Sequence, residues 1–187
     1  AWVCAGQPLI LVHGDVDDEL LEWLPGQVGF DREREIGGDP AYGFRQLVDI
    51  AERALSPGVN DPTTAIQCLD RLHALLRQLA RRDLGVGVTV VDGVARLRVP
   101  VPGWDDYVAL ACDEVRHWGA GSPRVLRRLR VLLDDLALVV EPGRRACLTE
   151  QLDRLEHRAA EVSYEWDATA DGAGDPAEHA NVRVRTD

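Results

Sequence analysis

The feature that most constrains the fold is a polar break, residues 56–61 with the sequence Ser-Pro-Gly-Val-Asn-Asp, between two runs of regularly spaced apolar residues. A residue before proline is disfavoured in the α region, so Ser56 and Asp61 are predicted to be non-helical. Gly58 can take a positive φ at low cost and so end one helix, while Asp61 can cap the next. Pro62 then falls at the first helical position, where its missing N–H costs nothing. The break predicts two helices folded back on each other.

Apolar spacing on both sides of the break supports this helical hairpin. Helical periodicity is shown before it by Phe44, Leu47, Val48, Ala51, Ala54 and Leu55, and after it by Ala65, Ile66, Leu69, Leu72, Leu76, Leu79 and Ala80. A short connection makes antiparallel packing the default arrangement. The same pattern of a capping residue followed by proline occurs at Asp39-Pro40 and Ser122-Pro123, and it predicts two further helix starts.

A β-hairpin is predicted over residues 86–99, because Asp92-Gly93 joins two runs rich in valine. Simple alternation would place Arg96 and Arg98 on one face and Ala95, Leu97 and Val99 on the other. Three more helices follow: one capped by Asp105, one capped by Ser122, and a last one over about residues 142–164.

The N-terminal residues suggest a β element that continues upstream. Residues 8–12 are predicted to form a strand, and Val3, Gly6, Gln7, Pro8 and Leu9 resemble the second half of a small biotinyl or lipoyl barrel, without its acceptor lysine. Asp15 or Asp17 is expected to cap a short helix that ends at Pro25-Gly26. Residues 27–35 are expected to be extended.

Together these patterns predict an α+β fold that is mainly α: an antiparallel helical core with one β-hairpin and a truncated N-terminal β element. The expected organisation is 1–35 for the β element and short helix, 36–165 for the helical core, and 166–187 for an acidic tail. The tail has almost nothing to bury and is expected to be disordered.

Composition excludes several classes of function. A net charge of −11 argues against a nucleic-acid partner and against electrostatic binding to an anionic membrane. No apolar run approaches the ~20 residues that span a bilayer, and no signal peptide is recognisable, so this polypeptide is expected to be soluble. The absence of Met predicts a fragment or a processed product. All 21 basic residues are Arg, which excludes lysine Schiff-base, P-loop and biotinyl or lipoyl chemistry.

The usual catalytic and metal-binding patterns are missing from the sequence. The four cysteines are scattered without a CxxC pair, and Cys68, Cys112 and Cys147 are interpreted as small apolar helix residues. The histidines show no ligand spacing, so no metal and no cofactor are predicted. A metal site built from His73, His117 and a carboxylate is the minor alternative. No GxSxG motif is present. The arginines of residues 124–130 are interpreted as a solvated helix face that pairs with nearby acidic residues.

One dense polar set is a candidate ligand site: Asp39, Arg45, Gln46, Asp49, Ser56, Asn60, Asp61, Thr63 and Thr64. The structural interpretation is that Asp61 and Thr64 cap a helix, Asn60 holds the turn, and Arg45 pairs with Asp49 at i,i+4. The functional interpretation is a small polar pocket at the bend. The structural interpretation is favoured, because capping explains half of the set.

The runs Gly43-x-Arg-Gln-Leu-Val-Asp-Ile-Ala51 and Ala54-Leu-Ser-Pro-Gly-x-Asn-Asp-Pro-x-Thr-Ala65 resemble one family, the predicted bacterial membrane proteins called domain-of-unknown-function family 2254. The resemblance covers about residues 1–160. It implies that the chain is the soluble C-terminal region of a protein with N-terminal transmembrane helices, at the cytoplasmic face of the plasma membrane. Two departures are present. Glu35 follows Arg34 where the family usually has Arg-Thr, and Gly38 precedes Asp39 where it usually has Gln-Asp.

The sequence therefore predicts a regulatory, sensing or assembly module that is not an enzyme. Its expected partner is the membrane-embedded N-terminal region of the parent protein, and a homo-oligomer is a further expectation. The alternative is an enzyme or small-ligand receptor in which Asp39, Arg45, Asp49 and Asp61 converge in a cleft. No particular small molecule is indicated.

Overall fold

The computed structural model describes residues 4, 6–8, 10–13, 17–29, 37–85 and 87–161. It divides into two compact units, Ala1–Glu35 and Ile36–Asp187, and each is described by itself. Most of the predicted extended stretch over residues 27–35 and the whole predicted tail over residues 166–187 lie outside the described residues.

The first unit contains the short helix α1, Asp18–Trp23, which continues into a 3-10 turn, η1, at Leu24–Gln27. Asp17 caps α1 as expected, because its carboxylate accepts a hydrogen bond from the Leu20 N–H at 2.8 Å. The predicted strand over residues 8–12 is wrong: Pro8 and residues 10–12 carry no strand. An isolated apolar run gains no ladder hydrogen bonds unless a second strand lies beside it, and the described part of this unit supplies none.

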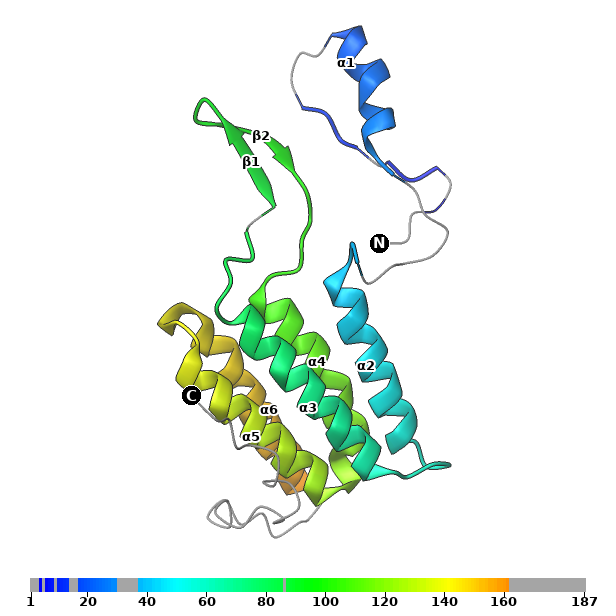
Figure 1. Ribbon diagram of the computed structural model, residues 1–187, viewed down its shortest axis with the longest axis vertical. Coiled ribbons are helices and arrows are strands. Elements are labelled where there is room, and N and C mark those ends of the chain that lie inside the picture. Colours follow the sequence, from blue (N-terminus) through cyan, green and yellow to red (C-terminus); the bar gives the residue numbers. More distant parts are fainter. Residues whose placement is uncertain are drawn as a thin grey trace, which may run out of the picture. The chain divides into compact units, whose positions relative to one another are not determined.

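The second unit is a bundle of five long helices with a β-hairpin extending from one end (Figure 1). The helices are α2 (Pro40–Leu55), α3 (Pro62–Leu79), α4 (Trp104–Trp118), α5 (Pro123–Val139) and α6 (Arg145–Glu161). The hairpin comprises β1 (Val88–Val91) and β2 (Val94–Arg98). Short 3-10 turns lie at Gly119–Gly121 (η2) and Pro142–Arg144 (η3). The fold is mainly α with one antiparallel hairpin, as the sequence predicts.

In the second unit, two of the predicted caps are confirmed. Asp39 accepts a hydrogen bond from the Tyr42 N–H at 3.2 Å, and Asp61 accepts from the N–H groups of Thr63 and Thr64 at 3.1 Å. Each cap is followed by proline at the first helical position. Pattern and geometry agree here because capping depends only on residues within one turn of each other.

Three other local predictions differ from the structure in part. Helix α5 begins at Pro123 with Ser122 at its N-cap position, as predicted, but the Ser122 side chain makes no capping bond. Helix α4 begins at Trp104, so Asp105 lies inside the first turn, and the Gly103 N–H instead donates to the Asp106 carboxylate at 2.8 Å. The final helix starts at Arg145, because Pro142–Arg144 forms a 3-10 turn.

The turn between α2 and α3 differs from the prediction in one residue. Asn60, with φ of 47°, adopts the left-handed conformation there, and Gly58 does not. The Asn60 N–H donates to the Ser56 carbonyl at 2.9 Å, and the Asp61 N–H donates to the Ala54 carbonyl at 2.7 Å. These two bonds close the end of α2, and asparagine is the non-glycine residue that tolerates this conformation best.

The core of the bundle is built mainly from leucine, valine and alanine side chains that face one another across the helices. Leu69, Leu72 and Leu76 of α3 are fully buried, as are Leu132 and Leu136 of α5. The ring centroids of Phe44 on α2 and Tyr107 on α4 lie 5.0 Å apart in a tilted contact. Burial of these periodic apolar faces is the main force that assembles the bundle.

A β-bulge changes the two faces of the hairpin from the predicted ones. Leu97 pairs with Thr89, whereas Ala95 pairs with Val90, so Arg96 is the extra residue. Thr89 and Val90 are neighbours in β1 and point to opposite faces. Leu97 and Ala95 therefore lie on opposite faces, and the prediction that they share one is wrong.

Candidate functional site

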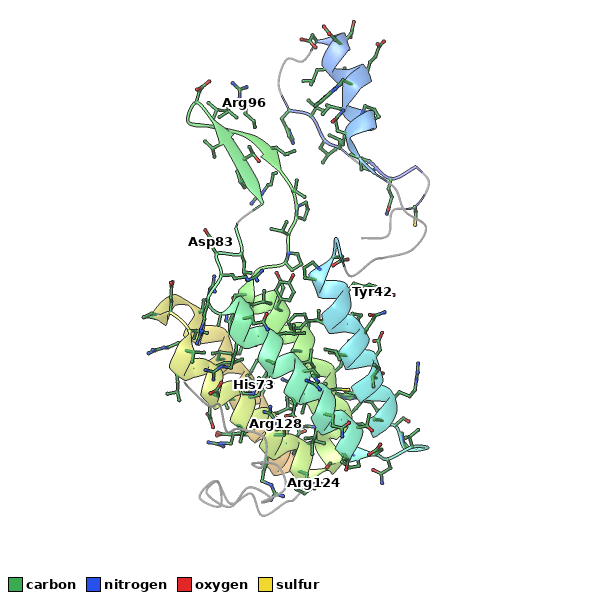
Figure 2. All side chains as sticks on the ribbon, viewed as in Figure 1. Tyr42, His73, Asp83, Arg96, Arg124 and Arg128 are labelled. Atoms are coloured by element: carbon green, nitrogen blue, oxygen red, sulfur yellow. The ribbon has the colours of Figure 1, made fainter. Side chains whose placement is uncertain are left out.

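The predicted site residues are distributed along the whole of α2 and into the start of α3. Asp39 caps the beginning of α2, while Ser56, Asn60, Asp61 and Thr64 lie at its other end. A helix of 16 residues is about 24 Å long, since each residue rises ~1.5 Å. The structure therefore does not bring Asp39 together with the turn. Figure 2 shows the polar side chains spread over the bundle.

At the turn, the carboxylate of Asp61 holds the first turn of α3. In addition to its two bonds from backbone N–H groups, it accepts a hydrogen bond from the Thr64 hydroxyl at 2.5 Å. The Thr64 hydroxyl bond, followed by the backbone bonds, lowers the pKa of Asp61. The Ser56 hydroxyl donates to the Arg53 carbonyl at 2.7 Å and so holds the end of α2. Asp61 and Thr64 thus have the capping roles expected from the sequence.

In the middle of α2, Arg45 joins this helix to α4. Its Nε donates to Asp49 at 2.5 Å, as predicted, and its Nη1 donates to Glu114 of α4 at 2.6 Å. Its Nη2 donates to the second carboxylate oxygen of Glu114 and lies 3.7 Å from Glu52. A bidentate arginine–carboxylate pair is among the stronger polar contacts in proteins. Gln46, the next residue, is exposed.

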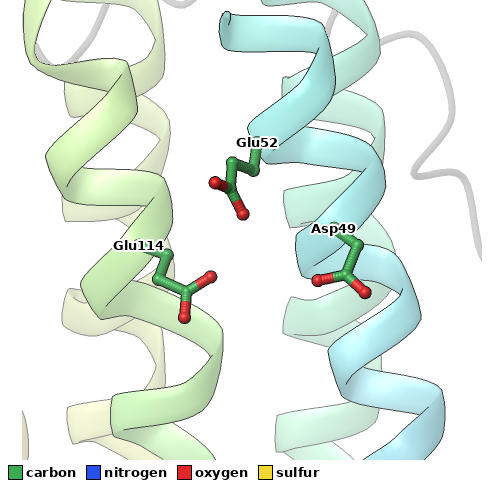
Figure 3. Close-up of side chains that lie close together, drawn as sticks. All are labelled: Asp49, Glu52 and Glu114. Carbon is green, nitrogen blue, oxygen red and sulfur yellow. The ribbon is translucent and has the colours of Figure 1, made fainter.

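Three carboxylates surround this arginine. Figure 3 shows Asp49 and Glu52 on one helix and Glu114 on the neighbouring helix. One oxygen from each lies within 4.8 Å of the other two. The hydrogen bond from Arg45 is the largest cause of a lowered pKa of Glu114, and the same bond raises the pKa of Arg45. Oxygen ligands at this spacing suit a divalent cation, but Arg45 already supplies the positive charge among them.

The sequence predictions named Arg45 and Asp49 but missed Glu52 and Glu114. A signal for Glu52 was present, because residues 45, 49 and 52 follow the i, i+4, i+7 spacing of one helix face. No local signal exists for Glu114, which is 69 residues away from Arg45 along the chain. Only the packing of α4 against α2 brings it to the cluster.

A shallow surface depression lies beside this cluster. It is lined by Asp49, Glu52, Arg53, Ser56 and Trp118. It therefore includes two residues of the predicted site, together with the exposed indole of Trp118 at the end of α4. Both α2 and α4 end here, and the carboxyl ends of helices carry partial negative charge that favours cations.

A second polar network joins α3 to α5. Figure 2 labels His73 and Arg128. Nε2 of His73 lies 2.7 Å from an Asp135 oxygen, and Nδ1 lies 2.9 Å from Nη2 of Arg128, so the neutral ring donates to Asp135 and accepts from Arg128. Arg128 also donates to Asp70 at 2.6 Å, and Arg77 donates to Asp135. Burial, the largest cause, lowers the pKa of His73, and Arg128 contributes in the same direction.

This network revises two minor predictions. The Arg128 side chain is 14% exposed, so it is not part of a solvated face, although it does form an ion pair with an acidic residue as expected. Within the described parts of the chain, Asp49, Glu52 and Glu114 are the one group with metal-ligand geometry, and neither His73 nor His117 belongs to it. The alternative metal site at those histidines is therefore not supported.

The sequence of the chain matches a known protein family. Residues 1–135 match the family described as "Predicted membrane protein (DUF2254)". The chain belongs to this family. The matched region contains the turn between α2 and α3, the Arg45 cluster and the hairpin.

Relatives of this DUF2254 chain occur in mycobacteria. An uncharacterised protein of Mycobacterium tuberculosis strain H37Rv and one of Mycobacterium bovis are each 39% identical to it over 145 residues. The aligned region covers 73% of this chain and 26% of each relative, so the chain spans about a quarter of their length. No solved structure matches it.

Two further observations concern the membrane and the family pattern. Within the described residues of this DUF2254 chain, no helix has both the length and the apolar composition that crossing a bilayer requires. Of the two departures from the usual family pattern, the one at residues 34–35 lies outside the described residues. At the other, glycine replaces the usual glutamine directly before Asp39, the N-cap residue of α2.

Proposed function

We propose that this chain is a regulatory or sensing module of a membrane protein and that it acts without catalysing a reaction. The observation that carries the proposal is the bridge that Arg45 makes between α2 and α4. The bridge lies at the surface, since the side chain of Arg45 is 27% exposed and that of Glu114 is 43% exposed. A charged group of a partner could therefore reach it and compete for it.

Such competition would change how α2 packs against α4. A cationic group of a partner would bind the carboxylates in place of Arg45. An anionic group of a partner would bind Arg45 in place of the carboxylates. Either event would weaken the contact between the two helices. The resulting change in the packing of α2 would be transmitted to the chain that leads into it. The proposed partner is the membrane-embedded remainder of the longer protein, and the proposed location is the cytoplasmic face of the plasma membrane.

Catalysis is tested first. Purified protein is incubated with a panel of esters, phosphates and nucleotides, and no turnover is expected. Turnover that Asp61→Ala abolishes, with the helical circular-dichroism spectrum retained, would overturn the proposal. Asp61→Asn is the matched control, because its side-chain oxygen can still cap α3.

Location is tested in the longer protein. Green fluorescent protein and alkaline phosphatase are fused in turn to the carboxyl end of this region, and the expected result is a fluorescent first fusion and an inactive second one. The reverse pattern would place the region on the opposite side of the membrane.

A second candidate function is binding of a small organic cation in the depression beside the cluster. Asp49 and Glu52 offer negative charge, and Trp118, which is 40% exposed, offers the face of an indole. Carboxylates combined with an indole are a common way to bind ammonium groups. This candidate site includes Asp49 and Ser56 of the predicted set. It differs from the predicted cleft, in which Asp39, Arg45, Asp49 and Asp61 were expected to converge.

Binding is measured by the chemical shifts of the Trp118 indole during titration with spermidine and with choline. Saturable shifts that disappear in Trp118→Leu and in Glu52→Gln are expected if the depression is a receptor site. Shifts that persist in both variants, or no shift at millimolar ligand, would remove this candidate.

A further inference from the structure

The β-hairpin of the second unit leaves most of its large apolar side chains exposed. Val90 is 58% exposed and Leu97 is 53% exposed, although these two residues lie on opposite faces of the hairpin. Two strands alone are marginally stable in water, and a third strand is usually needed for independent stability. Within the described residues, neither β1 nor β2 has another strand beside it. In this described part of the chain, both outer edges of the hairpin are therefore unpaired.

The two free edges differ in their protection against further pairing. β2 contains Arg96 and Arg98, and Arg96 is the bulged residue. Charged side chains and bulges are the devices by which sheets block an edge from pairing with another strand. β1 has the sequence Val-Thr-Val-Val, with no charge, no proline and no extra residue. The edge of β1 is thus open to strand addition, and the edge of β2 is guarded.

We propose that β1 pairs antiparallel with β1 of a second copy of this chain, which joins two hairpins into a four-stranded sheet. The strand is suited to itself, because β-branched residues pair well across strands and no like charges would face each other. A two-fold axis near Val90 would use both open edges at once. The new sheet would end in the two guarded β2 strands, so assembly would stop at the dimer.

Charge also favours this segment as the point of contact between copies. Each chain carries a net charge of −11, which makes two copies repel each other over most of their surfaces. The charged residues of β1, the turn and β2 are Asp92, Arg96 and Arg98, so the net charge of the hairpin is one positive charge. The hairpin therefore carries little net charge, so two acidic chains repel each other less there than over the rest of their surfaces. This inference stands apart from the proposed function, since a sensor, a receptor or an enzyme could dimerise through the same edge.

The test is sedimentation velocity of the full chain over a concentration series, with Val90→Lys and Ala95→Lys as matched variants. Val90 and Ala95 are direct cross-strand partners and share one face, so the two variants add the same charge to the same face. Only Val90→Lys places it on the open edge. We expect a concentration-dependent dimer, a dissociation constant raised roughly tenfold or more by Val90→Lys, and little change for Ala95→Lys.

Hydrogen exchange provides a readout that does not depend on the variants. In the wild-type protein, amides of β1 are expected to exchange more slowly at high than at low protein concentration, while the outer amides of β2 are unchanged. Three results would overturn the proposal: a monomer at every concentration, equal weakening by both variants, or association that weakens steeply as salt is added. The last two would mean association through a face of the hairpin or through charge pairs.

Discussion

The indole Nε1 of Trp104 donates a hydrogen bond to the carbonyl oxygen of Arg144 at 3.1 Å, and the guanidinium carbon of Arg144 lies 5.7 Å from the centroid of that indole ring. The same guanidinium donates to the carbonyls of Leu79, Ala80 and Arg82 at 3.3, 3.1 and 2.9 Å. One side chain thus joins the end of α3, the start of α4 and the connection between α5 and α6. This junction is the base from which the hairpin leaves the bundle.

Removal of this side chain by Arg144→Ala is expected to lower the free energy of unfolding by about 1–3 kcal/mol, because three carbonyls at the end of α3 lose their charged donor. The measurement is urea denaturation followed by circular dichroism. Arg145→Ala is the matched control, since Arg145 is the neighbouring, exposed arginine, and it should change stability little. Equal losses in both variants would contradict the bridging role of Arg144.

Replacement of Arg45 by Gln leaves three carboxylates close together without their shared cation. We expect a loss of about 1–2 kcal/mol in the free energy of unfolding, because the partly exposed carboxylates are screened by solvent. Added salt should restore part of the loss by screening their repulsion. Arg53→Gln, at an exposed arginine of the same helix, is the control. A loss in Arg45→Gln that does not respond to salt would argue against repulsion as its cause.

The stability of the protein should fall with pH below the ordinary His73 pKa of 6.5. Burial and the neighbouring Arg128 lower the pKa of His73 in the folded state, so the unfolded chain takes up the proton first as the pH decreases. The contribution of His73 is complete above pH 6.5 and is lost as the pH falls toward the folded value. Asp135, whose pKa is also lowered, adds its own loss only in a more acidic range, below 3.8.

This pH effect is checked by urea denaturation at about pH 8 and about pH 5, in the wild-type protein and in His73→Gln. The variant should be less stable at the higher pH but should lose less on acidification. Equal slopes in the two proteins would show that another group is responsible for the pH dependence.

Close packing at the turn after α4 predicts a contrast between two neighbouring glycines. A Cβ on Gly119 would lie 2.5 Å from Cγ1 of Val125 and 3.5 Å from Cδ1 of Leu55, whereas a Cβ on Gly121 would meet nothing within 4 Å. Gly119→Ala is therefore expected to destabilise the protein by about 1–3 kcal/mol through overpacking. Gly121→Ala should be close to neutral. Thermal unfolding of both variants decides the point, and equal midpoints would contradict it.

The elements that could be predicted from the sequence are those that depend on contacts within one turn. Asp39 and Asp61 cap their helices through bonds that reach at most three residues ahead. The hairpin turn is equally local, since Asp92 and Gly93 both adopt the positive φ that this type of turn requires. The periodic apolar faces predicted the helical core for the same reason, because periodicity depends only on spacing along the chain.

The tertiary structure alone decided the features that depend on distant residues. Glu114 reaches Arg45 only because α4 packs on α2, and the bulge at Arg96 depends on how β2 is paired with β1. The predicted convergence of Asp39 with the turn failed because α2 holds them a helix length apart. Local chemistry determines where helices begin and chains turn. Which charged side chains meet is determined by packing between elements far apart in the chain, and a local sequence pattern does not contain that information.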